Sequence, residues 1–214
     1  YRNDNGNFVE VGVEMGITQN FGYGLGVVTA DINKDGFTDI YVTNDFDEHD
    51  YYYVNTGGKG FKESIKSTMN HIPLYAMGVD VMDMNNDGYE DIYVTEMLPA
   101  ARKRAKISMP SMNVEGFNDL LSKGFYYQYM HNMLQLNQGN NLFSEVGKLS
   151  GVDKTDWSWA GLASDFDNDG MKDLLVTNGY RRDIFDNDVG LRIQDFFKEN
   201  RVNYNSAQKL LGER

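Results

Sequence analysis

The sequence contains no cysteine, few basic residues relative to acidic ones, and no long apolar run. Because there is no cysteine, the redox compartment stays undecided. The 20 lysines and arginines are outnumbered by 32 aspartates and glutamates, which gives a formal net charge of −12. This balance disfavours a nucleic-acid surface, since phosphate binding needs clustered basic side chains. No apolar stretch approaches the roughly 20 residues of a membrane-spanning helix.

What is present is enough apolar material for a folded core. Hydrophobic residues make up 41% and aromatic residues 13% of the 214 positions, which is typical of a globular chain rather than a disordered one. The length suits one large domain or two small ones. The chain begins at Tyr1 rather than at a methionine, and we expect it to be processed or cut from a longer protein.

A nine-residue pattern of acidic and amide residues occurs three times, at 31–39, 83–91 and 165–173. Each copy has an oxygen-bearing side chain at positions 1, 3, 5 and 9 and a glycine at position 6. Ca²⁺ takes six to eight oxygen ligands, and in a tight loop the carbonyl of position 7 is one of them. The pattern therefore predicts about three Ca²⁺ sites. Their predicted ligands are Asp31, Asn33, Asp35, Phe37 and Asp39; Asp83, Asn85, Asp87, Tyr89 and Asp91; and Asp165, Asp167, Asp169, Met171 and Asp173.

An alternative interpretation of a single copy is an ordinary acidic turn, since Asp, Asn and Gly are common turn residues. Three copies with the same ligand spacing argue against that alternative. The charge agrees, because the predicted ligand positions of the three loops contain ten carboxylates, most of the net charge of −12. Without a cation, each cluster would hold like charges close together, which raises carboxylate pKa values and destabilises the fold.

An EF-hand loop begins with the same order of ligands, but it also needs a bidentate glutamate at position 12 and a helix on each side. Position 12 is a valine in every copy, namely Val42, Val94 and Val176. The flanking segments, such as 26–30 and 40–43, predict short strands instead. Loops without that glutamate should bind Ca²⁺ weakly, which suits extracellular modules that work at roughly 10⁻⁴–10⁻³ M.

A second motif, an Asn- and Gly-rich turn followed by Phe-x-Glu, precedes each loop. Its phenylalanines are Phe8, Phe61 and Phe143, and the first aspartate of the next loop follows after 22 or 23 residues. Such turns between apolar stretches predict hairpins. Each unit is therefore expected to form four short antiparallel strands in about 50 residues, the size of a propeller blade.

The predicted fold class is all-β: a β-propeller of four-stranded antiparallel blades, with a helical insert and a helical C-terminal segment. The chain begins with the last two strands of one blade and ends with the first two of another, so it holds about three blades of a partial ring. Closed propellers have about 4–8 blades, and we expect the others to come from further sequence or another chain. The blades are assigned to 1–180, and a helical segment leading into the missing blades to 181–214.

The spacing between the second and third loops exceeds that between the first two by 30 residues, which places a partly helical insert at 98–131. The insert holds a basic cluster at 100–106, too short to indicate nucleic acid, and three tyrosines, Tyr126, Tyr127 and Tyr129. These tyrosines could face a sugar or a partner, or the insert could cap the propeller, which we favour. Aromatic residues also recur before each loop, where we expect core and inter-blade packing: Tyr23, Tyr75 and Trp157.

These features resemble a known repeat family. The loop motif between strands, together with the Asn-Gly-Phe hairpin, is similar to the FG-GAP/VCBS repeat, the calcium-binding blade of integrin-α-like propellers. Finer stretches, at 23–28, 43–48, 128–137 and 155–160, look like bacterial exported VCBS proteins of the CRTAC1-like group. The resemblance covers roughly residues 1–185 and implies a large secreted or surface-anchored bacterial protein. A fold shared this widely does not determine function.

We interpret the chain as a non-catalytic, calcium-stabilised module of an exported or cell-surface bacterial protein, which binds or scaffolds a glycan or protein partner. All recognisable chemistry is structural metal binding, and no catalytic or organic-cofactor residue can be assigned. One alternative is a calcium-dependent polysaccharide lyase or hydrolase that uses His49, His71 or His131, together with nearby tyrosines or the acidic residues Asp47, Glu48 or Asp50. Another, suggested by the resemblance, is an accessory subunit of an outer-membrane nutrient-uptake complex.

Overall fold

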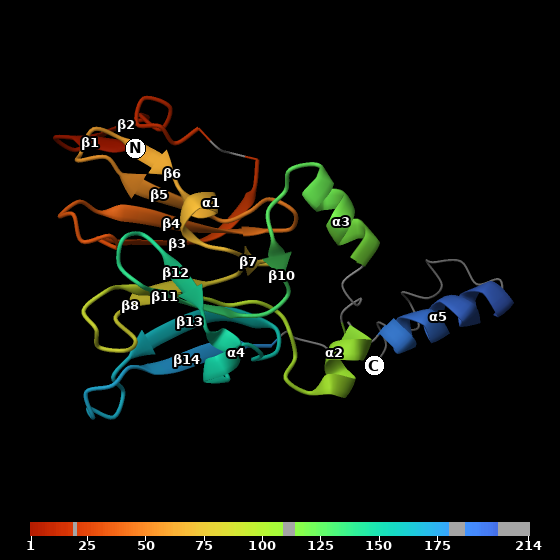
Figure 1. Ribbon diagram of the computed structural model, residues 1–214. Helices are drawn as coiled ribbons and strands as arrows, with labels where there is room; N and C mark the ends of the chain where they lie inside the picture. The colour runs from red at the N-terminus through yellow and green to blue at the C-terminus, as the bar shows by residue number, and fades with distance from the viewer. Residues whose placement is uncertain (19–20, 109–113, 180–186, 201–214) are drawn as a thin grey trace. The chain divides into compact units, whose positions relative to one another are not determined.

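The computed structural model describes residues 1–18, 21–108, 114–179 and 187–200 (Figure 1). The chain divides into two compact units, one of Tyr1–Ala100 with Met112–Gly179 and the other of Ala101–Ser111 with Tyr180–Arg214. Every strand of the described residues belongs to the first unit. Within that unit the antiparallel sheets lie side by side in chain order (Figure 1).

The first complete sheet has four strands in sequential order. They are β3 (Tyr23–Ala30), β4 (Asp39–Asp45), β5 (Tyr51–Asn55) and β6 (Phe61–Glu63). Each strand is antiparallel to the next, and Val27 pairs with Val42. The first nine-residue loop joins β3 to β4, and an Asn-Gly turn joins β5 to β6, as the repeat predicts.

The second complete sheet repeats this order around the insert. Its strands are β8 (Val79–Met82), β9 (Asp91–Val94), β11 (Met133–Asn137) and β12 (Phe143–Glu145). All three strand pairs are antiparallel. A four-residue helix follows the last strand of each complete sheet, α1 (Ile65–Thr68) in the first and α4 (Gly147–Ser150) in the second.

A two-stranded sheet lies at each end of the series. The first pairs β1 (Arg2–Asp4) with β2 (Asn7–Val9), and the last pairs β13 (Ser158–Ser164) with β14 (Asp173–Asn178). The part of the chain that the structure describes therefore has half a blade, two whole blades and another half. The prediction of a partial β-propeller of four-stranded antiparallel blades is confirmed.

One strand pairing was not predicted from the sequence. β7 (Ile72–Pro73), which follows the first complete sheet, pairs in parallel with β10 (Gln128–Tyr129) at the end of the insert. Parallel pairing of two-residue strands leaves no periodic pattern in the sequence, because alternation needs longer strands. The pairing brings the insert back to the junction between the blades.

The insert contains two helices, α2 (Arg102–Ser108) and α3 (Val114–Ser122), and the C-terminal segment contains α5 (Asn187–Asn200). The basic cluster lies mostly in α2, and the predicted helix around Leu191 is present as α5. A second C-terminal helix, predicted around Ala207, Leu210 and Leu211, lies outside the described residues. None of the described helices has the length and apolar content needed to cross a bilayer.

Two of the three tyrosines of the insert pack onto the blades. Tyr129 lies between the rings of His71, at 5.4 Å, and Phe117, at 5.5 Å, and the hydroxyl of Tyr126 donates to the carbonyl of Met69. Tyr127 remains about half exposed. These contacts favour the capping interpretation for the aromatic end of the insert.

The two complete blades meet near Gly26 on β3 and Thr43 on β4. The Thr43 hydroxyl accepts from the N–H of Gly26 at 2.8 Å and donates to the Met77 carbonyl of the next blade at 2.7 Å. Gly78 comes so close to the third blade that a Cβ on it would lie 2.6 Å from the carbonyl oxygen of Trp159. Backbone therefore packs directly on backbone at this interface.

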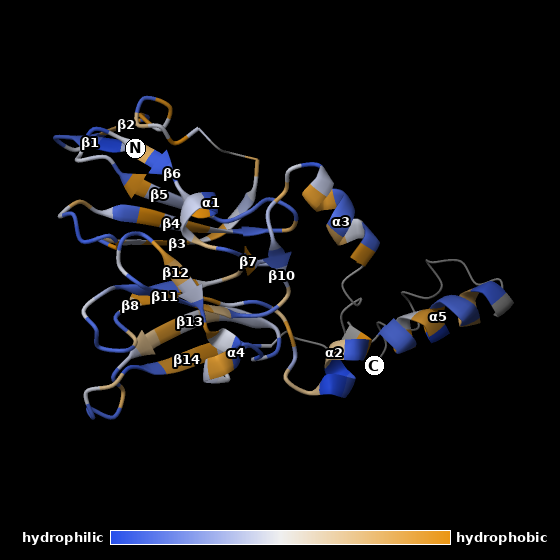
Figure 2. Ribbon diagram, in the orientation of Figure 1, coloured by the Kyte–Doolittle hydropathy of each residue, from blue (hydrophilic) through white to orange (hydrophobic). Residues whose placement is uncertain are grey.

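The two ends of the blade series expose apolar residues. In Figure 2 the strands β13 and β14 are largely hydrophobic, and their exposed members include Trp159, Leu162 and Leu175. On β3, at the other end, Tyr23 is 65% exposed, so this residue does not lie in the core of the described blades, and its expected inter-blade packing stays a prediction. Its ring instead contacts Phe46 edge-on at 5.4 Å, and Phe46 contacts Tyr75 at 5.9 Å.

Candidate metal-binding loops

The three nine-residue loops share one network of hydrogen bonds. In the second loop, the carboxylate of Asp83 accepts the N–H of Asp87 at 3.0 Å and the N–H of Gly88 at 2.8 Å. The corresponding aspartates of the other loops, Asp31 and Asp165, accept the same two N–H groups. This first aspartate therefore holds the backbone of positions 5 and 6 close to its carboxylate in every loop.

Two positions of each loop adopt left-handed backbone conformations. Position 6 is glycine in every copy, and φ is +88° at Gly88. Residues with a Cβ rarely adopt such a backbone angle. Position 4 has φ between +57° and +63° and is occupied by Lys34, Asn86 and Asn168. The two left-handed residues reverse the chain within the loop, so that alternate side chains can face one centre.

The oxygen atoms of the third loop converge. Carboxylate oxygens of Asp165, Asp167 and Asp169 all lie within 4.8 Å of one another. The first two loops have an asparagine in place of Asp167, and its amide oxygen accepts the N–H of position 5 at 3.0 Å in one loop and 3.1 Å in the other. A set of only oxygen donors in a turn of this kind fits a hard cation. The ligand roles of all fifteen residues, including the carbonyls of Phe37, Tyr89 and Met171, stay predictions.

The aspartate at position 9 links each loop to the Asn-Gly turn of the same blade. Asp39 and Asp91 are buried, and their carboxylates accept the N–H of Asn55 and Asn137, each at 2.8 Å. Burial raises the pKa of both aspartates, and these backbone hydrogen bonds partly offset the rise. The two sequence motifs of one blade are therefore parts of one structural unit, although 16 residues separate Asp39 from Asn55 and 46 separate Asp91 from Asn137.

The third loop lacks this partner within the described residues. Asp173 is exposed, and its carboxylate accepts the N–H of Phe166 at 3.0 Å, within the loop itself. The first two loops have their hairpins because β5–β6 and β11–β12 follow them, whereas β13–β14 forms a two-stranded sheet.

The loops lie next to one another along one edge of the blades (Figure 1). The ammonium group of Lys34 in the first loop lies over the ring of Tyr89 in the second, 4.9 Å from its centre. The amide of Asn86 in the second loop donates to the carbonyl of Gly170 in the third at 2.9 Å. In both cases position 4 of one loop contacts position 6 or 7 of the next. The loops therefore contribute to the joints between blades.

Residues 32–94 match the FG-GAP-like repeat. The match runs from the first loop, through the hairpin that buries Asp39, to the strand after the second loop. This stretch of the chain is similar to the FG-GAP-like repeat. The resemblance expected from the loop and hairpin motifs is confirmed.

The chain is also similar to cartilage acidic protein 1 of Homo sapiens, which is 25% identical over 175 residues, and to that of Mus musculus, 24% identical over 176 residues. The Xenopus tropicalis protein of the same name is 23% identical over 175 residues. These alignments cover 81% or 82% of this chain but 23% or 24% of the relatives. The chain thus spans about a quarter of the length of the curated relatives it matches.

Two further acidic residues of the blades are buried: Asp50, which the enzyme alternative named beside the histidines, and Glu96, for which no role was predicted. Burial raises the pKa of Asp50 to about 7 and the pKa of Glu96 to about 8. Asp50 accepts the hydroxyl of Tyr41 and the N–H of Asn44, each at 2.8 Å. Asn132 occupies the equivalent place in the second blade, where it accepts the N–H of Glu96 at 2.7 Å and donates to the hydroxyl of Tyr93 at 3.0 Å. An amide therefore fits this position as well as a carboxylate does.

We expect Asp50→Asn to stabilise the protein increasingly as the pH rises. The folded state raises the pKa of Asp50, so its contribution is fully present below about pH 4 and is lost as the pH rises through about 7. The asparagine carries no such penalty, and its advantage should grow by on the order of 2 kcal/mol between pH 5 and 8. Urea unfolding at saturating calcium measures this, with the exposed Asp47→Asn as control. An equal effect of Asp50→Asn at both pH values would contradict the raised pKa.

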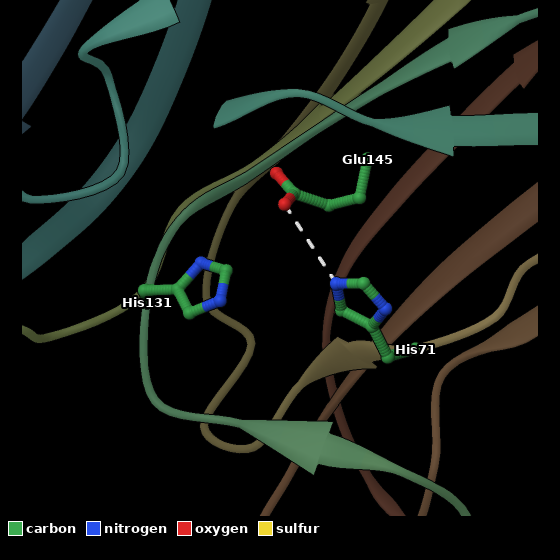
Figure 3. Close-up of side chains that lie close together, drawn as sticks. All are labelled: His71, His131 and Glu145. Carbon is green, nitrogen blue, oxygen red and sulfur yellow. Dashed lines mark ion pairs between the residues drawn. The ribbon is translucent and has the colours of Figure 1, made fainter. Parts of the chain in front are cut away.

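Two of the three histidines lie together, and the third does not. The Nε2 atom of His71 is 3.7 Å from a carboxylate oxygen of Glu145, with His131 beside them (Figure 3). His49 is in the first blade, with Nδ1 3.3 Å from a carboxylate oxygen of Glu48. Burial lowers the pKa of His131. Burial also acts to raise the pKa of Glu145, but hydrogen bonds from His71 and the Gly147 N–H hold it below its usual value.

Proposed function

We propose that this chain is a non-catalytic, calcium-stabilised β-propeller segment of an exported protein, and that it binds or scaffolds a protein or glycan partner. The observation that carries the proposal is the threefold repetition of one oxygen-lined loop with one hydrogen-bond network. A repeated network that orients only oxygen donors is suited to a structural cation. The predicted sites are those of the fifteen loop residues given above.

Calcium would stabilise two levels of the fold in this proposal. Within a loop, it would offset the repulsion between three or four carboxylates. Between blades, it would hold in place the loop residues that touch the next loop, such as Lys34 on Tyr89 and Asn86 on Gly170. A rigid row of loops is what a binding or scaffolding surface requires.

An extracellular location is part of the proposal. Loops without the bidentate glutamate should need calcium at roughly 10⁻⁴–10⁻³ M, the working range of extracellular modules. The exposed apolar residues at both ends of the blade series support a larger ring, because contiguous apolar surface of this kind is normally covered. We propose that further blades cover β3 on one side and β13–β14 on the other.

Calcium titration tests the metal sites. Calorimetry should give about three Ca²⁺ ions per chain, and Asp165→Ala should reduce the number by one because the first aspartate organises its loop. Asp167→Asn is the matched control, since it reproduces the donor set of the first two loops and should still bind. Unchanged stoichiometry in Asp165→Ala would refute the assignment of the third loop.

A further inference from the structure

A cluster of side chains at the junction of the two complete blades is separate from the calcium loops. His71 directly precedes β7, His131 comes shortly after β10, and Glu145 is the last residue of β12. The parallel pairing of β7 with β10 brings the two histidines together, although they are 60 positions apart. Figure 3 shows the three side chains pointing toward one another.

The hydrogen bonds around the cluster orient its donor atoms. The Nδ1 atom of His131 lies 2.8 Å from the backbone carbonyl of Asn132. A carbonyl only accepts, so Nδ1 carries the proton and Nε2 presents a lone pair. Carbonyls that accept from the other ring nitrogen orient metal-binding histidines in the same way. One oxygen of Glu145 accepts the N–H of Gly147 at 2.5 Å, and the other faces His71.

The three side chains of the cluster lie close together and are accessible to solvent on one side. One ligand atom from each of the three residues lies within 4.8 Å of the other two. His131 is 5% exposed, and the side chain of Glu145 is 9% exposed. The side chain of His71 is 29% exposed and leaves a route from solvent.

We propose that His71, His131 and Glu145 bind one divalent transition-metal ion of the Zn²⁺ type. Zn²⁺ takes imidazole nitrogens and carboxylate oxygens at about 2.0–2.2 Å, and a tetrahedral ion at those distances separates its ligands by roughly 3.3 Å. Small side-chain rotations would close the present spacing to that value. Two imidazoles distinguish this site from the oxygen-only loops, because nitrogen ligands suit Zn²⁺ and its neighbours rather than Ca²⁺. Three protein ligands leave a fourth position for water.

The first blade supplies an internal comparison. His49 and Glu63 occupy the repeat positions of His131 and Glu145, and Glu63 accepts the N–H of Ile65 as Glu145 accepts that of Gly147. The glutamate therefore holds the turn after the last strand in both blades. The second cluster differs from the first by the presence of His71. The sequence has only three histidines, so no histidine corresponds to His71 beside His49 and Glu63.

Zinc binding by the full chain tests the proposal independently of the calcium sites. Calorimetry with zinc chloride at saturating calcium should give one Zn²⁺ per chain. His71→Gln should weaken that binding by roughly 100-fold or more, and His49→Gln should leave it unchanged. Because His71 is partly exposed, its variant should keep the fold, which circular dichroism and an unchanged calcium stoichiometry would verify. His131→Gln should give the same loss as His71→Gln.

Cobalt provides a second readout. Co²⁺ bound in place of zinc should give the strong visible absorption of a four-coordinate site in the unmodified chain and in His49→Gln, and lose it in His71→Gln. The proposal is overturned if folded His71→Gln binds zinc as tightly as the unmodified chain. It is also overturned if excess calcium displaces the zinc, since the ion would then occupy the acidic loops.

Discussion

Removing calcium is expected to lower the melting temperature of this chain by about 4–20 °C. At about 2 mM free calcium, a site with a dissociation constant of roughly 10⁻⁴–10⁻³ M contributes about 0.7–1.8 kcal/mol. Three such sites contribute about 2–5 kcal/mol, and each kcal/mol shifts the midpoint of a domain of this size by about 2–4 °C. The carboxylates of each loop would also repel one another once the ion has gone.

Scanning calorimetry with EGTA in magnesium-containing buffer measures this effect, because EGTA removes calcium and leaves most of the magnesium. Restoring calcium should restore the melting temperature. Asp165→Ala should show a smaller shift than the unmodified chain, since one loop no longer contributes. A melting temperature that changes neither with EGTA nor with added calcium would rule out calcium as the stabilising ion.

Replacing Gly78 with alanine is expected to destabilise the protein by about 1–3 kcal/mol, toward the upper end of that range. A Cβ at this position would lie 2.6 Å from the carbonyl oxygen of Trp159 and 2.8 Å from the Cα of Ala160. Both are backbone atoms, so no side chain can rotate away. The strand β13 must move from β8, which disturbs the joint between the second and third blades.

Gly24→Ala is the matched control, because Gly24 also lies in a first strand, yet its Cβ would make only an ordinary contact, 3.6 Å from Val42. Urea unfolding of the two variants in saturating calcium gives the comparison. Equal stabilities would show that the second and third blades are not packed backbone to backbone. A loss confined to Gly78→Ala would establish that joint as rigid.

The repeat architecture was predictable because its determinants are local. The oxygen side chains at 1, 3, 5 and 9 and the glycine at 6 lie within nine residues, and the same network forms around Asp31, Asp83 and Asp165. Strand pairs in a blade are also neighbours in sequence, so a hairpin signal suffices to predict them. The number of loops and hairpins in the sequence also predicted the half-blade at each end.

The roles of single acidic residues were not predictable to the same degree. Asp91 and Asp173 hold the same position in the motif, yet Asp91 is buried against Asn137 and Asp173 is exposed. The difference depends on a hairpin that comes 46 residues later in one case, beyond the reach of a local pattern. The raised pKa of Asp50 was not predictable from the sequence either, because it comes from burial rather than from neighbours in sequence.

The amino-acid sequence by itself determined the number and spacing of the loops, the strands that flank them and the position of the insert, because each depends on residues a few positions apart. Only the tertiary structure decided that position 9 joins two motifs, that adjacent loops touch, and that His71 meets His131 and Glu145. These contacts arise from the stacking of blades and from a two-residue parallel pairing, which no periodicity of side chains records.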